Sequence, residues 1–421
     1  MNVVILNTAE LTGGAAVAAN RLMKALNRSG ANVSMLVRDQ KSRDPRVVSI
    51  NNSNLREKFN FMRFVWERLV IFLSNHLRRK PLFQVSIANT GSDLSSHPLV
   101  QNADVIHLHW INQGFLSLDD IKKLIRIGKP VVWTMHDMWP CTAICHYSFG
   151  CERFKKECGK CPFLSSSDKK DLSYHVFNKK RFLADSKIQL VAVSTWLRQQ
   201  AQDSALTNRL PVEVIPNVID RSLFVLSDKA EARKSLSLPL DKKIILMGAA
   251  RINDPIKGFE YLVKALSILK ERKGEEDYFL VLFGGIKGDD SFLSEIPISY
   301  VWMGSLSDPS MIAKLYAAAG YRSGRHYAGD LERYIGSAGH SVERRLCSLR
   351  SYGKRRLSEK VCYRSSDRWS GRKRTDCKLL CLPCRHQAGR GHIPDSRRSC
   401  AGRYSNCGNS AGGTGHCLCR R

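Results

Sequence analysis

The first 37 residues, MNVVILNTAELTGGAAVAANRLMKALNRSGANVSMLV, decide the fold class of this chain. The apolar run at 3–6 predicts a short buried strand, and the loop at 8–14 leads into a helix that ends at Ser29-Gly30. One face of that helix is apolar, formed by Ala15, Ala18, Ala19, Leu22 and Leu26. A second strand follows at 33–37. A strand, a helix and a strand in this order predict a parallel sheet with right-handed crossovers.

The alternation of strands and helices continues to about residue 320. Further strands are predicted at 104–109, 131–135, 189–193, 212–215, 243–247, 278–283 and 300–303, with helices at 118–127, from about 194 onward, at 259–270 and at 308–319. The pattern predicts two doubly wound α/β units in tandem. We assign residues 1–210 to a first domain and 211–320 to a partial second domain.

The composition of the whole chain suits a two-domain enzyme. The chain has 421 residues, of which 43% are hydrophobic and 25% charged, so most of it can bury a core. The most apolar window, at 61–73, is interrupted by Arg63, Glu67 and Arg68, which excludes a membrane span there. The first residues form a strand rather than a leader peptide. We therefore expect a cytoplasmic protein without disulfides.

The last 101 residues differ from the rest in composition. Residues 321–421 carry 23 Lys and Arg against 7 Asp and Glu, together with nine of the 14 cysteines. They contain only 12 Leu, Ile, Val and Phe, which is too few for a packed core. This aberrant basic tail is predicted to be disordered. Much of the net charge of +29 comes from it, so the charge does not mark the whole chain as a nucleic-acid binder.

A basic amphipathic helix is predicted at 55–80. Aromatic and aliphatic side chains alternate there with arginines and Lys80. The simpler interpretation is a helix packed on the first domain. The alternative is peripheral contact with the inner face of a membrane.

Two of the candidate site features follow strands of the first domain. Gly13 and Gly14 lie in the first strand-to-helix turn, where backbone N–H groups can bind an anion or a sugar oxygen. His136 follows the strand at 131–135, at the edge where ligands bind in parallel sheets. The glycines can equally be ordinary turn residues, and His136 can be structural. There is no G-x-G-x-x-G and no Gly-Lys-Ser/Thr phosphate loop, so a dinucleotide cofactor is not expected.

A cationic pair follows the first strand of the second domain. Arg251 and Lys257 lie on one loop, in the stretch RINDPIKG at 251–258. The forked guanidinium and the compact ammonium suit a diphosphate. The alternative is a solvated loop, where both residue types are common.

Four cysteines fall within 17 residues of one another. Their spacing is C-x5-C-x6-C-x2-C, formed by Cys145, Cys151, Cys158 and Cys161. Four thiols in a cytosolic chain can hold a structural zinc ion. Free or redox-active thiols are the alternative.

Taken together, these segments resemble family 4 glycosyltransferases of the GT-B fold, the group that builds bacterial polysaccharides. The matching residues lie at 7–16, 104–110, 131–140, 145–147, 158–162, 193–196, 214–220, 251, 257–258, 283–285, 303–308 and 315–319. The resemblance implies two Rossmann-like domains facing a cleft. It implies retaining, metal-independent transfer of a sugar from a nucleotide-sugar donor to a glycan or lipid-linked acceptor. It also implies that Arg251 and Lys257 bind the donor diphosphate, that His136 contacts the donor sugar, and that Gly13 and Gly14 line the cleft near the donor phosphate.

The sequence departs from that family after the predicted helix at 308–319. The family continues with an Asp, a buried strand ending in Pro-Ser, and two Glu residues separated by seven others. Here Glu332, Glu343 and Glu359 do not have that spacing, and no Pro-Ser precedes them. A coding sequence read in the wrong frame from about codon 320 would produce such a change. We therefore hypothesise a frameshift and an inactive product.

Three functions remain open on the sequence alone. The first is a glycosyltransferase by descent. The second is a non-catalytic sugar-nucleotide binder, which would retain Arg251 and Lys257 but lack the paired glutamates. The third is a nucleic-acid-binding protein that uses its basic tail, although the tail shows no pattern of interleaved aromatic and basic residues. The sequence does not identify the donor sugar, the acceptor or the oligomeric state.

Overall fold

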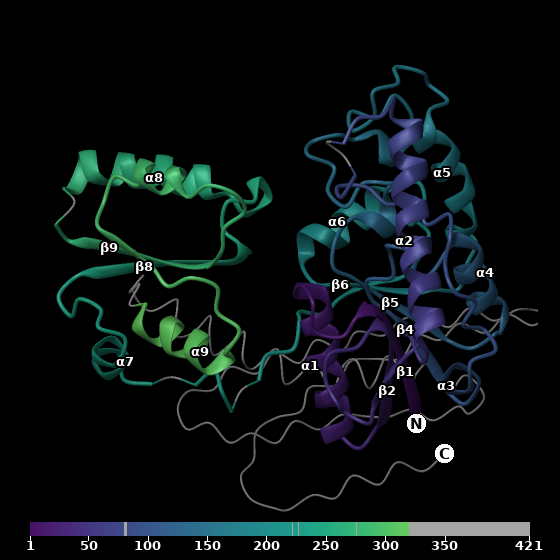
Figure 1. The fold of residues 1–421 in the computed structure, drawn as a ribbon, viewed down its shortest axis with the longest axis horizontal. Coiled ribbons are helices and arrows are strands. Elements are labelled where there is room, and N and C mark those ends of the chain that lie inside the picture. Colours follow the sequence, from purple (N-terminus) through teal and green to yellow (C-terminus); the bar gives the residue numbers. More distant parts are fainter. Residues whose placement is uncertain (80–81, 221, 226, 275, 320–421) are drawn as a thin grey trace, which may run out of the picture. The chain divides into compact units, whose positions relative to one another are not determined.

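A computed structural model describes residues 1–319, apart from 80–81, 221, 226 and 275. The described residues form two parallel sheets flanked by helices (Figure 1). The fold class is therefore α/β, as the sequence predicts. The tail at 321–421, predicted to be disordered, lies outside the described residues.

The first sheet has the strand order of a doubly wound fold. Its strands are β1 (Asn2–Ala9), β2 (Asn32–Asp39), β3 (Val47–Ser49), β4 (Val105–Leu108), β5 (Val131–Met135), β6 (Gln189–Ala192) and β7 (Val212–Val214). They run parallel in the order β3-β2-β1-β4-β5-β6-β7. The order reverses between β1 and β4, and ligands of such sheets bind beyond the carboxyl ends of the strands at this reversal.

Helices cover both faces of the first sheet. They are α1 (Gly14–Arg28), α2 (Asn54–Ser74), α3 (Pro98–Gln101), α4 (Leu118–Arg126), α5 (Leu172–Lys180) and α6 (Thr195–Asp203). Their beginnings are set by local chemistry; at α4 the Ser117 hydroxyl and the Asp120 carboxylate each accept from the other's backbone N–H, which forms a capping box.

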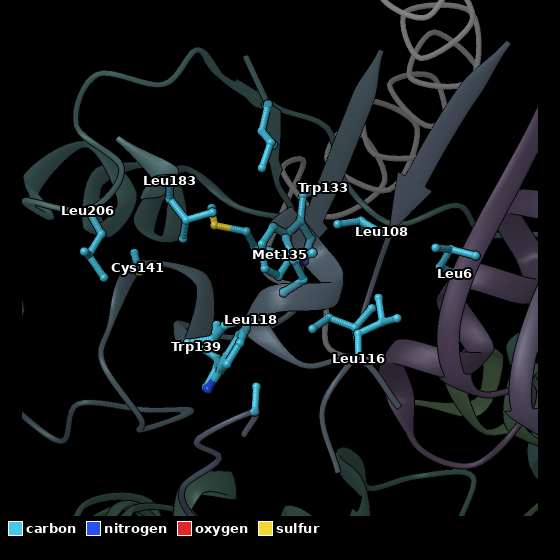
Figure 2. Packing of buried hydrophobic residues seen from close by; sticks show 14 of the residues in the cluster. Leu6, Leu108, Leu116, Leu118, Trp133, Met135, Trp139, Cys141, Leu183 and Leu206 are labelled. Carbon is cyan, nitrogen blue, oxygen red and sulfur yellow. The ribbon is translucent and has the colours of Figure 1, made fainter. Parts of the chain in front are cut away.

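Alternate residues of the strands supply the two cores of this unit. In β1, Val3 and Ile5 pack with the apolar face of α1, whereas Val4 and Leu6 belong to the larger core on the opposite face. Figure 2 shows Trp133 of β5 within that larger core, between Leu108 on one side and Leu183 on the other. Both faces of the sheet are therefore buried, as a parallel sheet requires.

The second sheet is smaller among the described residues. Its strands β8 (Lys243–Arg251), β9 (Tyr278–Gly285) and β10 (Tyr300–Trp302) run parallel in the order β10-β9-β8. Helix α8 (Phe259–Lys273) covers one face, and α7 (Lys229–Ser235) with α9 (Pro309–Ala318) covers the other (Figure 1). Both faces of this sheet are therefore covered by helices as well.

The first sheet extends past the predicted domain boundary. Strand β7 begins beyond residue 210 and pairs with β6, and Ile215 and Val218 are buried in the core next to α1. Strand β3 and helices α3, α5 and α7 are not among the predicted elements. No described helix is both long and apolar enough to cross a bilayer.

Candidate active site

His136 lies at the carboxyl edge of the first sheet, directly after β5. Its Nε2 shares a hydrogen bond of 2.9 Å with Nδ1 of His109, which follows β4, and the two rings stack with centroids 5.1 Å apart. The carbonyl of His109 accepts from the Trp133 indole at 2.9 Å. His136 is half-buried. Its ring is therefore held in one orientation at the edge where such sheets bind ligands.

Asp137 ties the two loops at this edge together. Its buried carboxylate accepts hydrogen bonds from the Trp110 indole (2.9 Å), the Trp139 backbone N–H (2.9 Å) and His146 Nδ1 (2.7 Å). Burial raises the pKa of Asp137, but attraction by His146 and these hydrogen bonds outweigh burial, and the net pKa lies below its usual value. Asp137 is therefore an anion at neutral pH and supports the segment that carries His136.

Ser86, His146 and Asp137 form a chain that resembles a hydrolase triad in composition only. The Nε2 of His146 lies 3.1 Å from the Ser86 hydroxyl. That hydroxyl is buried, and an Arg68 guanidinium nitrogen lies 3.4 Å away. A nucleophilic serine must reach its substrate. We conclude that the chain of hydrogen bonds positions the loops and does not supply a nucleophile.

Lys180, at the end of α5, is buried below the same loop. Its ammonium donates to the carbonyls of Trp139 (2.6 Å) and Thr142 (3.0 Å) and lies 3.2 Å from the Trp139 ring centroid. Burial lowers the pKa of Lys180 to about 7. Lys180 therefore fixes the short 3-10 turn Trp139–Cys141 that follows the site.

Gly13 and Gly14 begin α1 at the end of β1. Gly13 has φ +89°, a conformation that favours glycine, and no side chain caps the first turn of the helix. A Cβ at either glycine would meet open space. The backbone N–H groups of this turn are therefore accessible to an anion.

The second sheet carries the cationic pair at its own carboxyl edge. Arg251 ends β8, and Lys257 ends the 3-10 turn Pro255–Lys257, just before Gly258 (φ +75°) and helix α8. Both side chains are exposed. Within the described part of the chain, neither makes a side-chain hydrogen bond or ion pair. Their charges are therefore available to a ligand.

Asn253 connects that loop to the one after β9. Its amide donates to the Lys287 carbonyl (2.8 Å) and its oxygen accepts from the Lys287 N–H (3.1 Å). The exposed Lys287 is thereby brought beside the Arg251 loop, a third cation that the sequence pattern does not single out. Gly284 has φ +132°, and a Cβ there would lie 1.8 Å from the Ala249 carbonyl oxygen. The two strands approach closely only because this residue is glycine.

The four cysteines line one small cavity. Cys145, Cys151, Cys158 and Cys161 are all unoxidised and line it together with apolar side chains and a few polar ones, among them Arg153. Burial raises the pKa of Cys145 to about 11 and of Cys158 and Cys161 to about 12, so these thiols are protonated and unreactive at neutral pH. In the described ranges, no three His, Cys, Asp or Glu residues are arranged to hold a metal ion. The structural zinc ion stays a prediction.

The sequence of the first unit matches a known family over just over half of the chain. The profile of Glycosyltransferase Family 4 matches residues 12–223. The chain belongs to glycosyltransferase family 4. Its two α/β units, each a parallel sheet with helices on both faces, agree with the GT-B class that the resemblance implies.

Individual relatives are more distant. WcaC of Escherichia coli (strain K12), described as a colanic acid biosynthesis glycosyl transferase, is 36% identical over 72 residues, which is 16% of this chain and 17% of WcaC. The match therefore spans under a fifth of that protein's length.

Solved structures resemble the chain loosely. The trehalose-6-phosphate synthase OtsA is 15% identical, with a TM-score of 0.43, over 75% of this chain and 76% of its own. WaaG, a glycosyltransferase involved in lipopolysaccharide biosynthesis, is 12% identical, with a TM-score of 0.43, over 84% of this chain and 93% of its own. At these scores the likenesses place no residue, and the fold rests on the two sheets themselves.

Proposed function

We propose that this fold transfers a sugar from a nucleotide-sugar donor to a glycan or lipid-linked acceptor in polysaccharide assembly, with retention and without a catalytic metal. Family membership supports the class of reaction. The description of WcaC, which refers to colanic acid biosynthesis, supports a polysaccharide product.

The observation that carries the proposal is the exposed cationic pair of the second sheet. Arg251 ends β8 and Lys257 lies in the turn that follows it, and no described residue forms an ion pair with either side chain. A forked guanidinium and an ammonium can bind a diphosphate and stabilise the charge that develops on it as the sugar leaves. These cations would supply the electrostatic role that a divalent ion has in metal-dependent transferases.

Two groups at the carboxyl edge of the first sheet would also contact the donor. The turn at Gly13 and Gly14 would donate backbone N–H groups to a phosphate oxygen. His136 would hydrogen-bond the donor sugar near its reacting carbon, because its ring is oriented by His109.

A specific observation favours a second candidate, the non-catalytic sugar-nucleotide binder. The paired glutamates of the family are missing from the sequence after residue 319. Those carboxylates contact the donor sugar and ribose in the family. We propose that the present chain still binds the donor diphosphate but transfers sugar very slowly or not at all.

Calorimetry with the purified full-length chain tests donor binding. We expect UDP, GDP or one of their sugar conjugates to bind, with affinity unchanged by EDTA. The double variant Arg251→Ala/Lys257→Ala should bind at least tenfold more weakly, since two charge-assisted contacts are lost. Arg272→Ala, which removes an exposed cation at the far end of α8, should bind as the wild type does. Equal affinities of the double variant and the wild type would refute the diphosphate site.

Nucleotide release separates the two candidates. Donor bound without release in the presence of acceptor mixtures supports the non-catalytic binder, whereas release that depends on acceptor supports an active transferase. An acceptor linked to lipid is presented at a membrane surface. The segment at 55–80 is the part of the chain that would meet this surface.

A further inference from the structure

Helix α2 (Asn54–Ser74) is packed with its polar side inward. The residues of this helix that are buried are Asn60, Glu67, Arg68 and Ile71, and only the last is apolar. In a soluble amphipathic helix the apolar stripe faces the core. In α2 the fully buried positions are mostly polar instead, and of the remaining apolar residues Phe64, Val70 and Phe72 are half-buried.

Specific contacts fix this orientation. The Glu67 carboxylate accepts from the backbone N–H groups of Ile87 (2.8 Å) and Ala88 (2.9 Å) and pairs with Arg68 at 2.8 Å. The Arg68 guanidinium donates to the carbonyls of Val85 (3.0 Å) and Leu82. Buried charges with this many partners are costly to rearrange, so rotation of α2 about its axis is strongly opposed.

The outward side of α2 is a continuous apolar stripe. Six exposed residues recur at spacings of four and three and fall within about 80° of the helix circumference. They are Leu55 (79% exposed), Phe59 (60%), Met62 (60%), Trp66 (55%), Leu69 (41%) and Leu73 (58%). Phe61 and Val65 widen the stripe, and the exposed Leu77 and Phe83 follow the helix. Isolated exposed apolar residues are common, but an ordered stripe along a 21-residue helix marks an interaction surface.

Exposed cations flank the stripe at both ends. Arg56 and Lys58 lie in the first turns of α2, and Arg78 and Arg79 follow its end. Glu57 is the only exposed acidic residue of the helix. Aromatic and aliphatic side chains along a helix, bordered by Lys and Arg, are the pattern of helices that lie in the interface of an anionic membrane.

We propose that α2 lies flat on an anionic lipid bilayer, with the stripe from Leu55 to Leu73 inserted at the level of the headgroups. The helix does not qualify as a membrane span, so contact is with the surface only. A second copy of the chain fits less well. Whether two such helices pair parallel or antiparallel, the cationic ends meet cationic ends, and only Glu57 is exposed to offset them.

Vesicle co-sedimentation tests the proposal with the full-length chain. Wild-type protein should pellet with phosphatidylcholine vesicles that contain phosphatidylglycerol, more weakly with phosphatidylcholine alone, and less as NaCl rises. Trp66→Glu should lower the partition coefficient at least tenfold. Trp196→Glu on α6 is the matched control, because Trp196 is also 55% exposed and the charge change is the same. The control should bind like the wild type.

The outcomes distinguish a lipid surface from a protein interface and from binding through the basic tail. If Trp66→Glu pellets like the wild type, the proposal is overturned and the basic tail accounts for any binding. If light scattering shows a dimer that Trp66→Glu converts to a monomer, the stripe is a protein interface and the proposal is overturned. Because both tryptophans are exposed, circular dichroism should report unchanged folds. Vesicle binding requires no donor, so the result is independent of the diphosphate site.

Discussion

At the scale of single residues, the candidate site depends on groups whose partners are distant in the sequence. His136 is oriented by His109, 27 residues earlier, and Asp137 collects donors from Trp110, Trp139 and His146. None of these supporting residues is identified by a motif. The signal available in the sequence was the position of His109 at the end of a predicted strand, close to the signal that identified His136.

Asp137→Asn should lower the free energy of unfolding by about 3 kcal/mol at pH 7, because three donors lose their buried carboxylate acceptor. The folded pKa of Asp137 is lowered, so its stabilisation is present above the unfolded pKa of about 3.9 and is lost as pH falls through the folded value. Urea unfolding across pH should therefore show the difference between variant and wild type shrinking below about pH 4. Glu213→Gln, at an exposed position on β7, is the control. A constant difference at all pH values would contradict this assignment.

Lys180 should make stability rise with pH above neutrality. Its folded pKa is lowered to about 7 by burial, and that of the unfolded chain is about 10.4. Between these two pKa values the unfolded state therefore binds more protons than the folded state. Raising the pH in this range destabilises the unfolded state relative to the folded one. Between pH 7 and 10 the free energy of unfolding of the wild type should rise relative to that of Lys180→Met. Parallel urea curves for the two proteins over this range would show that Lys180 stays charged in the fold.

At the scale of elements, the second sheet depends on a close approach of two strands at their carboxyl ends. Gly284 donates its N–H to the Gly304 carbonyl (2.7 Å), and its own carbonyl accepts from the Trp302 indole (2.9 Å). These bonds join β9 to the segment around β10, while Ile252 bonds to Gly285. The loop with Arg251 and Lys257 is therefore anchored by the backbone hydrogen bonds of Gly284 and Gly285.

Gly284→Ala should destabilise the second unit by more than 2 kcal/mol, a rough figure for a backbone clash added to strain at positive φ. The new Cβ would lie 1.8 Å from the Ala249 oxygen. Thermal unfolding measures the loss. Gly288→Ala is the matched control, because Gly288 also has positive φ (+83°) but faces open space, and it should cost only about 1 kcal/mol. Equal costs for the two variants would show that the strands can separate without penalty.

At the scale of the whole molecule, the sequence changes character where the second domain should continue. Described structure ends with α9, while the family pattern requires a further buried strand and two glutamates. The change in composition at about residue 320 coincides with this point.

Reading the gene in the other two frames beyond codon 320 should reveal an Asp, a strand ending in Pro-Ser, and two Glu codons separated by seven others. Restoring that frame should yield a protein with acceptor-dependent nucleotide release. The measurement is the nucleotide sequence across codons 310–330 together with the intact mass of the isolated protein. If neither alternative frame encodes this pattern, and the mass matches translation in the present frame, the frameshift hypothesis fails.

The sequence by itself determined the α/β class and most strands and helices of both sheets. Residues 131–135 coincide with β5, and the helix predicted at 118–127 agrees with α4 within one residue. Such elements are readable because their apolar periodicity is local. The sequence also located His136 and Arg251 at strand ends and Lys257 in the loop after Arg251, and the topology then assigns these strand ends to the carboxyl edges of the two sheets.

Only the tertiary structure decided which side chains meet and which faces remain exposed. The sequence predicted an amphipathic helix at 55–80 and left open whether its apolar side packs inward. The structure shows that Glu67 and Arg68 are buried instead, where they hydrogen-bond backbone groups of Val85, Ile87 and Ala88. Contacts of this kind join residues about 14 to 60 positions apart, and no local pattern encodes them.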